Sequence, residues 1–227
     1  AETGSLSASM IASGAITVAE ANIGTHIETE DKENENKEDN GHLKTIVNIS
    51  DGNSFTAESL TAEAKADAVQ KVDMNALSIS ASLLPNGAVQ ANVGGAETYS
   101  DVTVSIGESV FKGNANSDGI DLNINGNNSV DQDVTAKGIY ASSFFASGTN
   151  DADSNIVLKT EVEAEGSEES DVHDLVVRAD SNADITTTAQ GDGGGLIGIS
   201  PDAASVDNNY SADTDVTLRG IWNAAGT

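Results

Sequence analysis

The 227-residue sequence contains no cysteine, so neither disulfide bonds nor thiolate metal sites are available to it. It is also poor in basic residues, since 10 Lys and Arg stand against 37 Asp and Glu, and the formal net charge is −27. Nucleic-acid recognition needs cations that neutralise phosphates and aromatic rings that stack on bases, and an anionic lipid surface repels an acidic chain. The composition therefore predicts no nucleic-acid partner.

Aromatic residues make up only 4% of the chain, and hydrophobic residues, many of them alanine, make up 37%. Soluble domains usually contain about 45–50% apolar residues, in a count that includes glycine. Large side chains are thus too few to fill a thick globular core, and we expect a thin one. No apolar run approaches the roughly 18 residues that a membrane span requires, so no membrane-spanning segment is predicted.

A degenerate motif, in which two apolar residues are followed by a small residue, a turn former and glycine, recurs along the chain. It occurs at residues 9–14, 82–87 and 143–148, while residues 195–200 keep the apolar pair, and the first apolar positions are 73, 61 and 52 residues apart. We therefore expect a single repetitive domain over residues 1–227, with approximate repeats at 5–76, 77–137 and 138–189 and a partial repeat at 190–227. An incomplete last copy is expected either of a segment of a longer array or of a terminal cap.

The longest interval contains the sequence ETEDKENENKED at residues 28–39, which has no apolar residue. Such a block predicts an acidic, solvated surface loop over residues 28–40. A surface insertion costs a stacked scaffold little, because loop-closure entropy grows slowly with length. Without the acidic insertion, the first interval between motif copies would be close to the second interval of 61 residues. Residues 47–52 also match residues 104–109, and residues 217–222 fall near the same place after the fourth motif.

Several stretches rich in branched residues and bounded by Gly, Asn, Asp or Ser predict short β-strands. They lie at residues 102–106, 120–124, 157–162 and 216–218. Residues 60–68 alternate apolar and polar side chains, which indicates a strand with one buried face, although the same residues also favour a helix. A thin interior of small residues suits an all-β, repetitive parallel β-solenoid, with Asn and Gly at its corners. A β-sandwich, or an array of sandwiches, is the alternative.

Residues 75–81, the apolar pair before Gly87 and residues 102–107 resemble the repeats of giant bacterial filamentous adhesins of the haemagglutinin and leukotoxin type. Residues 193–198 followed by 216–218 are similar to another variant of those repeats. The resemblance covers most of residues 5–227. It implies a secreted, elongated β-helical stalk or adhesin at the cell surface, without an active site. The acidic insertion departs from the compact pattern of such repeats.

Two segments read D-x-[DN]-x-[DN], the opening of a loop that binds a hard cation. Their candidate ligands are Asp151, Asp153 and Asn155 in the first segment and Asp180, Asn182 and Asp184 in the second. Alternation would place three oxygen ligands on one side of an extended segment, where Ca²⁺ could bind them. Ile156 and Ile185 stand where an EF-hand has glycine, so these are not EF-hands. The favoured interpretation is a solvated acidic face at a turn, with no cofactor, and the alternative is a weak Ca²⁺ site.

The remaining candidates are weaker. His26, His42 and His173 have no zinc-ligand partner at a recognised spacing and are predicted to be surface residues. The glycine-rich residues 191–195 lack the Lys and Ser/Thr of a phosphate loop and predict a turn. Asn48, Asn127 and Asn209 satisfy the N-glycan acceptor rule, which matters only if the cell exports and glycosylates the chain.

The leading hypothesis is a structural or adhesive segment of a secreted bacterial surface protein, not an enzyme. Its expected partners are neighbouring repeats of the same polypeptide and a host or cell-surface receptor or glycan. One alternative is the subunit of a self-assembling extracellular filament, in which free strand edges of successive copies pair. A less favoured one is a polysaccharide-acting β-helix enzyme, which would need converging carboxylates. The net charge favours a saline, extracellular setting, because salt screens self-repulsion.

Overall fold

A computed structural model describes residues 2–9, 14–24, 43–82, 87–195 and 202–224, and the regular elements in these ranges are all β-strands. In chain order they are β1 (Glu2–Ser9), β2 (Gly14–Gly24), β3 (Leu43–Ile49), β4 (Asn53–Thr56), β5 (Ser59–Ser82), β6 (Gly87–Lys112), β7 (Ile120–Ser142), β8 (Phe145–Gly166), β9 (Asp171–Gly195), β10 (Asp202–Gly220) and β11 (Asn223–Ala224). Among the described residues, no helix could cross a membrane. The acidic loop predicted at 28–40, together with His26 and His42, lies outside these ranges.

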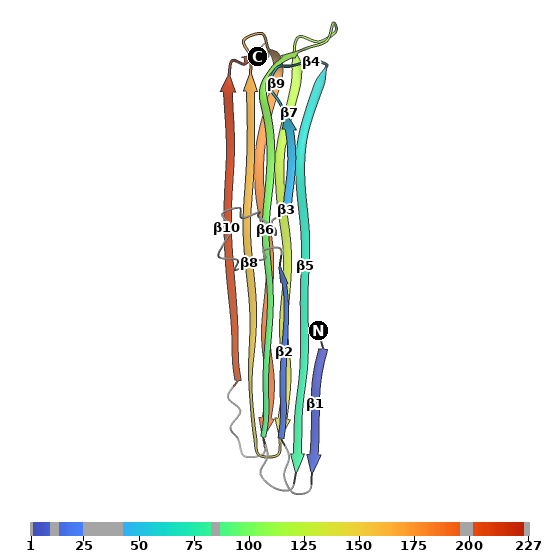
Figure 1. Ribbon diagram of the computed structural model, residues 1–227, viewed down its shortest axis with the longest axis vertical. Helices are drawn as coiled ribbons and strands as arrows, with labels where there is room; N and C mark the ends of the chain where they lie inside the picture. Colours follow the sequence, from blue (N-terminus) through green and yellow to red (C-terminus); the bar gives the residue numbers. More distant parts are fainter. Residues whose placement is uncertain (1, 10–13, 25–42, 83–86, 196–201, 225–227) are drawn as a thin grey trace, which may run out of the picture.

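The strands form two parallel sheets. Sheet A has the order β1-β5-β7-β9-β11, and sheet B has the order β10-β8-β6-β2, with β3 and β4 also paired to β6. Every pair of neighbouring strands is parallel. Successive long strands alternate between the sheets and run in opposite directions (Figure 1). One long strand from each sheet therefore makes one coil, and the chain is a flattened parallel β-solenoid, as the sequence predicted.

The long strands contradict the prediction of short strands separated by turns. Strands β5 to β10 contain between 19 and 26 residues. At about 3.3 Å per residue, the 23 residues of β7 span about 75 Å, and the long axis of the molecule runs along the strands (Figure 1). The predicted strands are segments of these longer ones. Glycine and asparagine do not interrupt them, because inner strands are held by backbone pairing on both sides.

Side chains alternate strictly between the interior and the outer faces. In β7 every second residue, from Ile120 to Ser142, is buried, and the residues between are exposed or half-buried. Residues 60–68, which the sequence left open between strand and helix, belong to β5, and Ala62, Ala64 and Ala66 are buried there. The interior is thin, as predicted, because alanine and valine supply much of it. Aromatic rings gather near one end, where Phe111 stacks on Phe55 and Trp222 with ring centroids 5.5 and 5.7 Å apart.

The register between coils places like residues in rows. Val47 lies opposite Val104, Val104 opposite Val162, and Val162 opposite Val216. The match between residues 47–52 and 104–109 is therefore confirmed as far as Ile49 and Ile106, but Ser109 pairs with Asn53 and not with Gly52. Gly14 pairs with Gly87, but Gly87 pairs with Phe145 instead of Gly148. The alignment of residues 143–148 on 82–87 was therefore wrong by three positions at the glycine. The turn from β7 to β8 is shorter than that from β5 to β6, which shifts the register.

Glycine alone supplies left-handed backbone at the described corners. Positive φ angles occur at Gly52, Gly119 and Gly220, and no other described residue type has one, so asparagine does not take the predicted role at any corner that the structure describes. At Gly119, with φ 136°, an added Cβ would also lie 2.7 Å from the backbone nitrogen of His173. Residues 191–195, predicted to form a turn, instead end strand β9. The glycines at the end of β9 remain in the strand because their backbone pairs with β7.

Candidate functional site

The six predicted metal ligands lie on the outer faces of two different sheets. Asp151, Asp153 and Asn155 project outward from β8, because the residues between them are buried. Asp180, Asn182 and Asp184 belong to β9 in sheet A. The predicted alternation is therefore correct, but the two triplets do not come together.

Extended backbone separates the members of each triplet. Alternate side chains on a strand are about 6.6–7 Å apart, whereas oxygens that share a Ca²⁺ ion lie about 2.3–2.6 Å from it. Across strands, Asp153 lies opposite Asp207 of β10 in the pairing register. Burial, followed by the charges of Asp151 and Asp207, raises the pKa of Asp153 above the ordinary carboxyl value. Calcium binding at the six residues remains a prediction.

Other members of the triplets take part in hydrogen bonds across the sheets. Asn155 Nδ2 donates to Glu97 Oε1 at 2.8 Å, and Asn209 Nδ2 donates to Asn155 Oδ1 at 3.1 Å. Ser205 Oγ donates to Asp151, and Arg178 pairs with Asp180 within the single strand β9. The contacts of Asn155 and Asp151 join neighbouring coils along the outer face of sheet B. The acceptor-site asparagines Asn48, Asn127 and Asn209 lie within β3, β7 and β10.

A group of possible ligands that the sequence did not reveal surrounds His173. Its Nδ1 lies 2.9 Å from Asp121 Oδ1 and 3.8 Å from Asp174 Oδ2, and the side chains of His173 and Asp121 are about half exposed. The hydrogen bond with Asp121, followed by the charges of Asp174 and Asp121, raises the pKa of His173. Imidazole and carboxylates are ligand types that divalent transition metals accept. The surface position predicted for His173 is confirmed.

The Asp121–His173 contact results from an irregularity in the ladder. Ile120 pairs with Val172 and the next residue, Asp121, pairs with Asp174, so His173 is the additional residue of a bulge. Asp174 is adjacent in sequence, but Asp121 is not. The contact between Asp121 and His173 could therefore have been predicted only from the register between the coils.

A buried polar layer crosses the interior between the sheets. Gln132 Nε2 of β7 donates to Gln70 Oε1 at 2.9 Å and to Thr98 Oγ1 at 2.8 Å, and Ser154 Oγ of β8 donates to Gln132 Oε1. Gln70 and Gln132 occupy neighbouring strands of sheet A, whereas Thr98 and Ser154 belong to sheet B. A buried amide without hydrogen-bond partners is costly, and a shift of one coil along the strands would separate these partners. The polar layer therefore favours the observed register of the coils over shifted registers.

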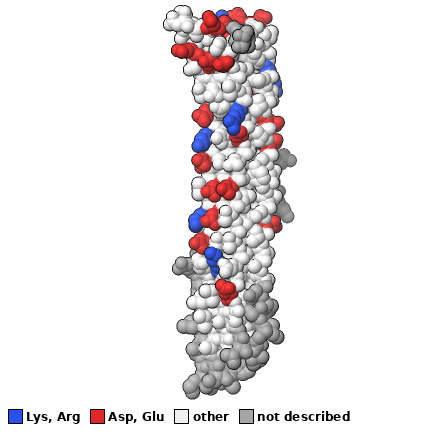
Figure 2. Space-filling view, turned by 180° about the vertical axis from the view of Figure 1, so that it is seen from behind, with Lys and Arg blue, Asp and Glu red and all other residues white. Residues whose placement is uncertain are grey.

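A row of alternating charge, which we call the sheet B charge row, crosses the outer face of sheet B. The pairing registers place in succession Lys44, Asp101, Lys159 and Asp213. The hydrogen bond and charge of Glu161 raise the pKa of Lys159, and the charges of Asp101 and Asp213 add to this effect. The row begins with a cation on β3 and ends with an anion on β10. Elsewhere, acidic and basic side chains are interspersed along the face seen in Figure 2.

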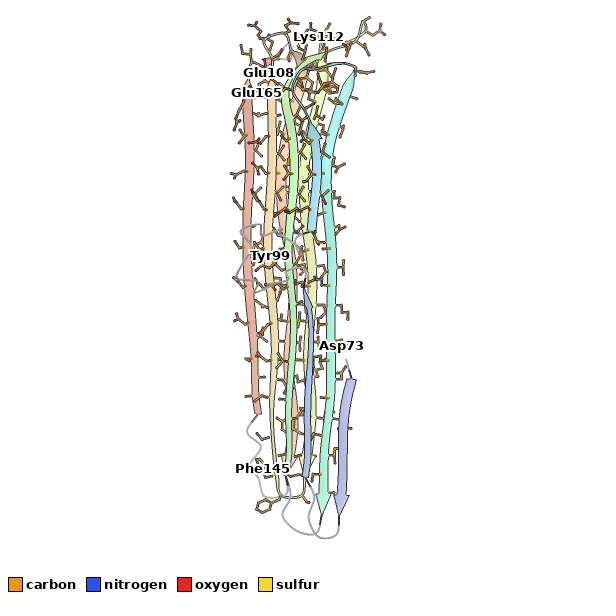
Figure 3. All side chains as sticks on the ribbon, viewed as in Figure 1. Asp73, Tyr99, Glu108, Lys112, Phe145 and Glu165 are labelled. Carbon is orange, nitrogen blue, oxygen red and sulfur yellow. The ribbon has the colours of Figure 1, made fainter. Side chains whose placement is uncertain are left out.

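Shallow depressions occur on the outer faces, and two of them are lined by residues that the structure describes. One, of about 190 Å³, has Asp51, Glu163, Glu165 and Arg219 in its lining, with Arg219 Nη2 lying 3.5 Å from Glu163 Oε1. The other, of about 420 Å³, is lined by residues of β5, β7 and β9, including Lys65 and Asp180. In Figure 3 the labelled Glu108, Lys112 and Glu165 gather at the end of the molecule where the first depression lies. Both depressions are open surface features.

Comparisons with known proteins found no matching family model, curated protein or solved structure. The resemblance to filamentous adhesins therefore remains a prediction. Inferences about function rest on the ladders, the charges and the exposed edges of this molecule.

Proposed function

We propose that this chain is a structural segment, with an adhesive role, of a secreted bacterial surface protein, and that it performs no catalysis. The observation that carries the proposal is the parallel pairing of very long strands: β7 pairs with β5 through 22 positions on one side and with β9 through 23 on the other, with one bulge at His173. The inner coils are thereby fixed to both neighbours along nearly their whole length. Such a body suits a scaffold that resists deformation.

The outer faces support the adhesive part of the proposal. Long strands present parallel rows of side chains, such as Glu97–Asn155–Asn209 and the sheet B charge row, over broad and nearly continuous faces. Repeated amide and carboxylate groups offer hydrogen-bond partners to a glycan or to a polar protein surface. A rigid face lowers the conformational entropy lost on binding.

The acidic composition supports an extracellular setting. A net charge of −27 on 227 residues produces strong self-repulsion, and physiological salt reduces its range to about 8 Å. The absence of cysteine leaves the fold independent of the redox state of its surroundings.

Antibody labelling of intact source cells tests the location. We expect a polyclonal antibody raised against the purified chain to label unpermeabilised cells, and the signal to fall after mild treatment of intact cells with protease. Labelling that requires permeabilisation would overturn the secreted location.

A bead assay tests adhesion separately. Beads coated with the chain should attach to host-type cell monolayers or to a glycan array more than beads coated with albumin do. A triple Asn-to-Ala variant of Asn155, Asn209 and Asn127 should reduce attachment if the amide rows contribute. Equal attachment of chain-coated and albumin-coated beads would overturn the adhesive role and leave only a structural one.

A further inference from the structure

The last strand of sheet B has an open edge. Among the described residues, β10 has a hydrogen-bonded neighbour on its β8 side alone. The side chains of β10 that continue the buried rows of β8 are themselves exposed: Val206, Tyr210, Val216 and Leu218 are between 46% and 48% accessible. The edge therefore combines unpaired backbone with uncovered apolar side chains, as a strand does that accepts another strand.

At the opposite end of sheet B, the strands β3 and β4 pair with β6 and with no other strand that the structure describes. Leu43 and Ile46 of β3 are also exposed, at 39% and 61%. In Figure 1 the two ends are displaced sideways from each other, with β10 at the left edge of the molecule. A copy of the molecule translated along the stacking direction would bring its β3–β4 edge to the β10 edge of the first.

We propose that the β10 edge binds the β3–β4 edge of a second copy of this chain, in parallel and in register, so that copies stack head to tail. The proposal deepens the structural function proposed above and rests on it, because it makes each chain one section of a longer solenoid. Every pair of hydrogen-bonded neighbouring strands described within the molecule is already parallel, and translation preserves that orientation.

The sheet B charge row fixes the register. Within one molecule it reads Lys44, Asp101, Lys159, Asp213, with opposite charges on each pair of adjacent strands. Continued by one more strand in the same register, it places Lys44 of the second copy beside Asp213 of the first. Lys44 would then lie between two aspartates, as Lys159 already does. Opposite charges on directly paired strands stabilise a sheet, and like charges destabilise it.

Stacking also brings together a second pair of opposite charges, with the anion on the β3–β4 side and the cation on β10. One row of paired residues runs from Ile49 through Ile106 to Leu218, and the next runs from Asn53 through Ser109 to Gly220. Asp51 lies between Ile49 and Asn53, and Arg219 lies between Leu218 and Gly220. Stacking in register therefore brings Asp51 of the second copy to Arg219 of the first. The β3–β4 edge thus carries a cation and then an anion, and the β10 edge carries an anion and then a cation.

The apolar rows agree with the same register. Val47 of the second copy would lie on Val216, and Ile49 on Leu218, and these rows are Val104–Val162 and Ile106–Ala164 within the molecule. The inner members of the rows are buried, whereas Val216 and Leu218 are 47% and 46% exposed. Stacking would give the outer members the same cover.

Charge also disfavours the symmetric alternative. If β10 paired antiparallel with β10 of a second copy, the acidic residues Asp207, Asp213 and Asp215 of one edge would face the same acidic edge. Arg219 is the only base in that strand. Such a pair concentrates like charge, whereas the head-to-tail arrangement matches opposite charges.

Sedimentation velocity of the purified chain tests the association. At about 0.15 M salt, where screening limits the repulsion between the acidic copies, we expect oligomers that grow with protein concentration. The variants Lys44→Asp and Asp213→Lys should each dissociate at least tenfold more readily, and the double exchange should restore association. Lys137→Asp makes the same change of charge on the inner strand β7 and should leave association unchanged.

Cysteine pairs test the register, since the chain has no cysteine of its own. A Lys44→Cys, Asp213→Cys double variant should form disulfide-linked ladders under oxidation. The two positions lie three strands apart within one molecule, about 14 Å, which is too far for an intramolecular disulfide. Lys44→Cys combined with Asp207→Cys, displaced six residues along β10, should form none.

Three outcomes would overturn the proposal. These are a monomer at all salt and protein concentrations, equal cross-linking of the two double variants, and cross-linking of Asp213→Cys alone, which would indicate the symmetric β10 pair. If the purified chain is a monomer but the antibody labels the cell surface, stacking is rejected and the proposed structural function at the surface stands. If the purified chain forms oligomers but the antibody labels only permeabilised cells, stacking stands and the secreted location is rejected.

Discussion

The coil made by β7 and β8 and the coil made by β9 and β10 share an alternation of apolar and polar side chains but differ in burial. Ile156 of β8 is fully buried, while Tyr210, its direct neighbour in β10, is 46% exposed. Val162 and Val216 differ in the same way, at 0% and 47%. The alternation of apolar and polar side chains continues through both coils. Burial in this fold is therefore decided by whether coils lie on both sides, and the outer coil has one on a single side.

The same difference separates the roles of the two coils. The inner coil carries the polar layer around Gln132, which ties the sheets together. The outer coil presents Asp213, Arg219 and an open backbone edge. Stability is expected to depend on the inner coil, and association on the outer one.

The largest expected difference in stability is between alanine substitutions at Ile156 of the inner strand β8 and at Tyr210, its neighbour in the outer strand β10. Ile156→Ala should lower the free energy of unfolding by about 2–5 kcal/mol, because it leaves a cavity beside Val130 and Leu158. Tyr210→Ala should cost less than about 1 kcal/mol in the monomer, since its ring is already half exposed. Urea unfolding at low salt and low protein concentration measures both. Equal losses would mean that the two coils are equally covered.

Two glycines sharpen the comparison through overpacking. A Cβ at Gly148 of β8 would lie 2.2 Å from Cε1 of the fully buried Tyr140, so Gly148→Ala should destabilise the fold by about 1–3 kcal/mol. At Gly194 of β9 the added methyl group meets nothing within 4 Å. Gly194→Ala should therefore be neutral or stabilise by up to about 1 kcal/mol, through the unfolded state. Thermal unfolding of both variants decides, and a harmless Gly148→Ala would contradict the packing around Tyr140.

The polar layer gives a third contrast. Gln132→Ala removes the donor to Gln70 and Thr98 and should cost about 1–3 kcal/mol, because buried polar groups lose their partner. The control Gln190→Ala changes an exposed glutamine of β9 and should cost less than about 0.5 kcal/mol. Chemical denaturation of the two variants measures the difference. No loss in Gln132→Ala would show that the layer does not stabilise the register.

The smallest expected effect depends on pH. The raised pKa of Asp153 means that the folded chain holds this proton more tightly than the unfolded chain does. The contribution of this proton to the free energy of unfolding is fully present below the ordinary carboxyl pKa of about 3.9. It is lost as the pH rises through the raised pKa of Asp153. Asp153→Asn should therefore stabilise the chain at neutral pH, by less than about 1 kcal/mol for so accessible a group, and the gain should vanish near pH 3. Asp171→Asn is the control, and a destabilised Asp153→Asn at neutral pH would contradict the assignment.

Much of the fold could be predicted from the sequence. The short stretches of branched residues and the scarcity of large side chains favoured a thin, parallel β-solenoid over a β-sandwich, and the structure agrees with that preference. The match between residues 47–52 and 104–109 gave the correct register of β3 on β6. These features are local patterns, and a strand with one buried face displays them directly.

The length of the strands and the grouping of side chains could not be predicted in this way. Gly94 and Gly126 would end a strand in most sheets, but here they lie inside strands whose backbones pair with a coil on each side. Asp121 meets His173, and Lys44 begins a charge row that ends at Asp213, only because the coils have one particular register. That register depends on turn lengths that differ from coil to coil.

Hydrogen exchange at single amides tests the central claim most directly, namely that β8 is paired along both edges and β10 along one. In a parallel sheet the amides of a strand point alternately to its two neighbours. At low salt and low protein concentration, where we expect the chain to be monomeric, we predict slow exchange at consecutive residues through β8 and alternating slow and fast exchange along β10. Protection that comes in short blocks separated at glycine and asparagine, or that is equally continuous in both strands of the monomer, would contradict the account.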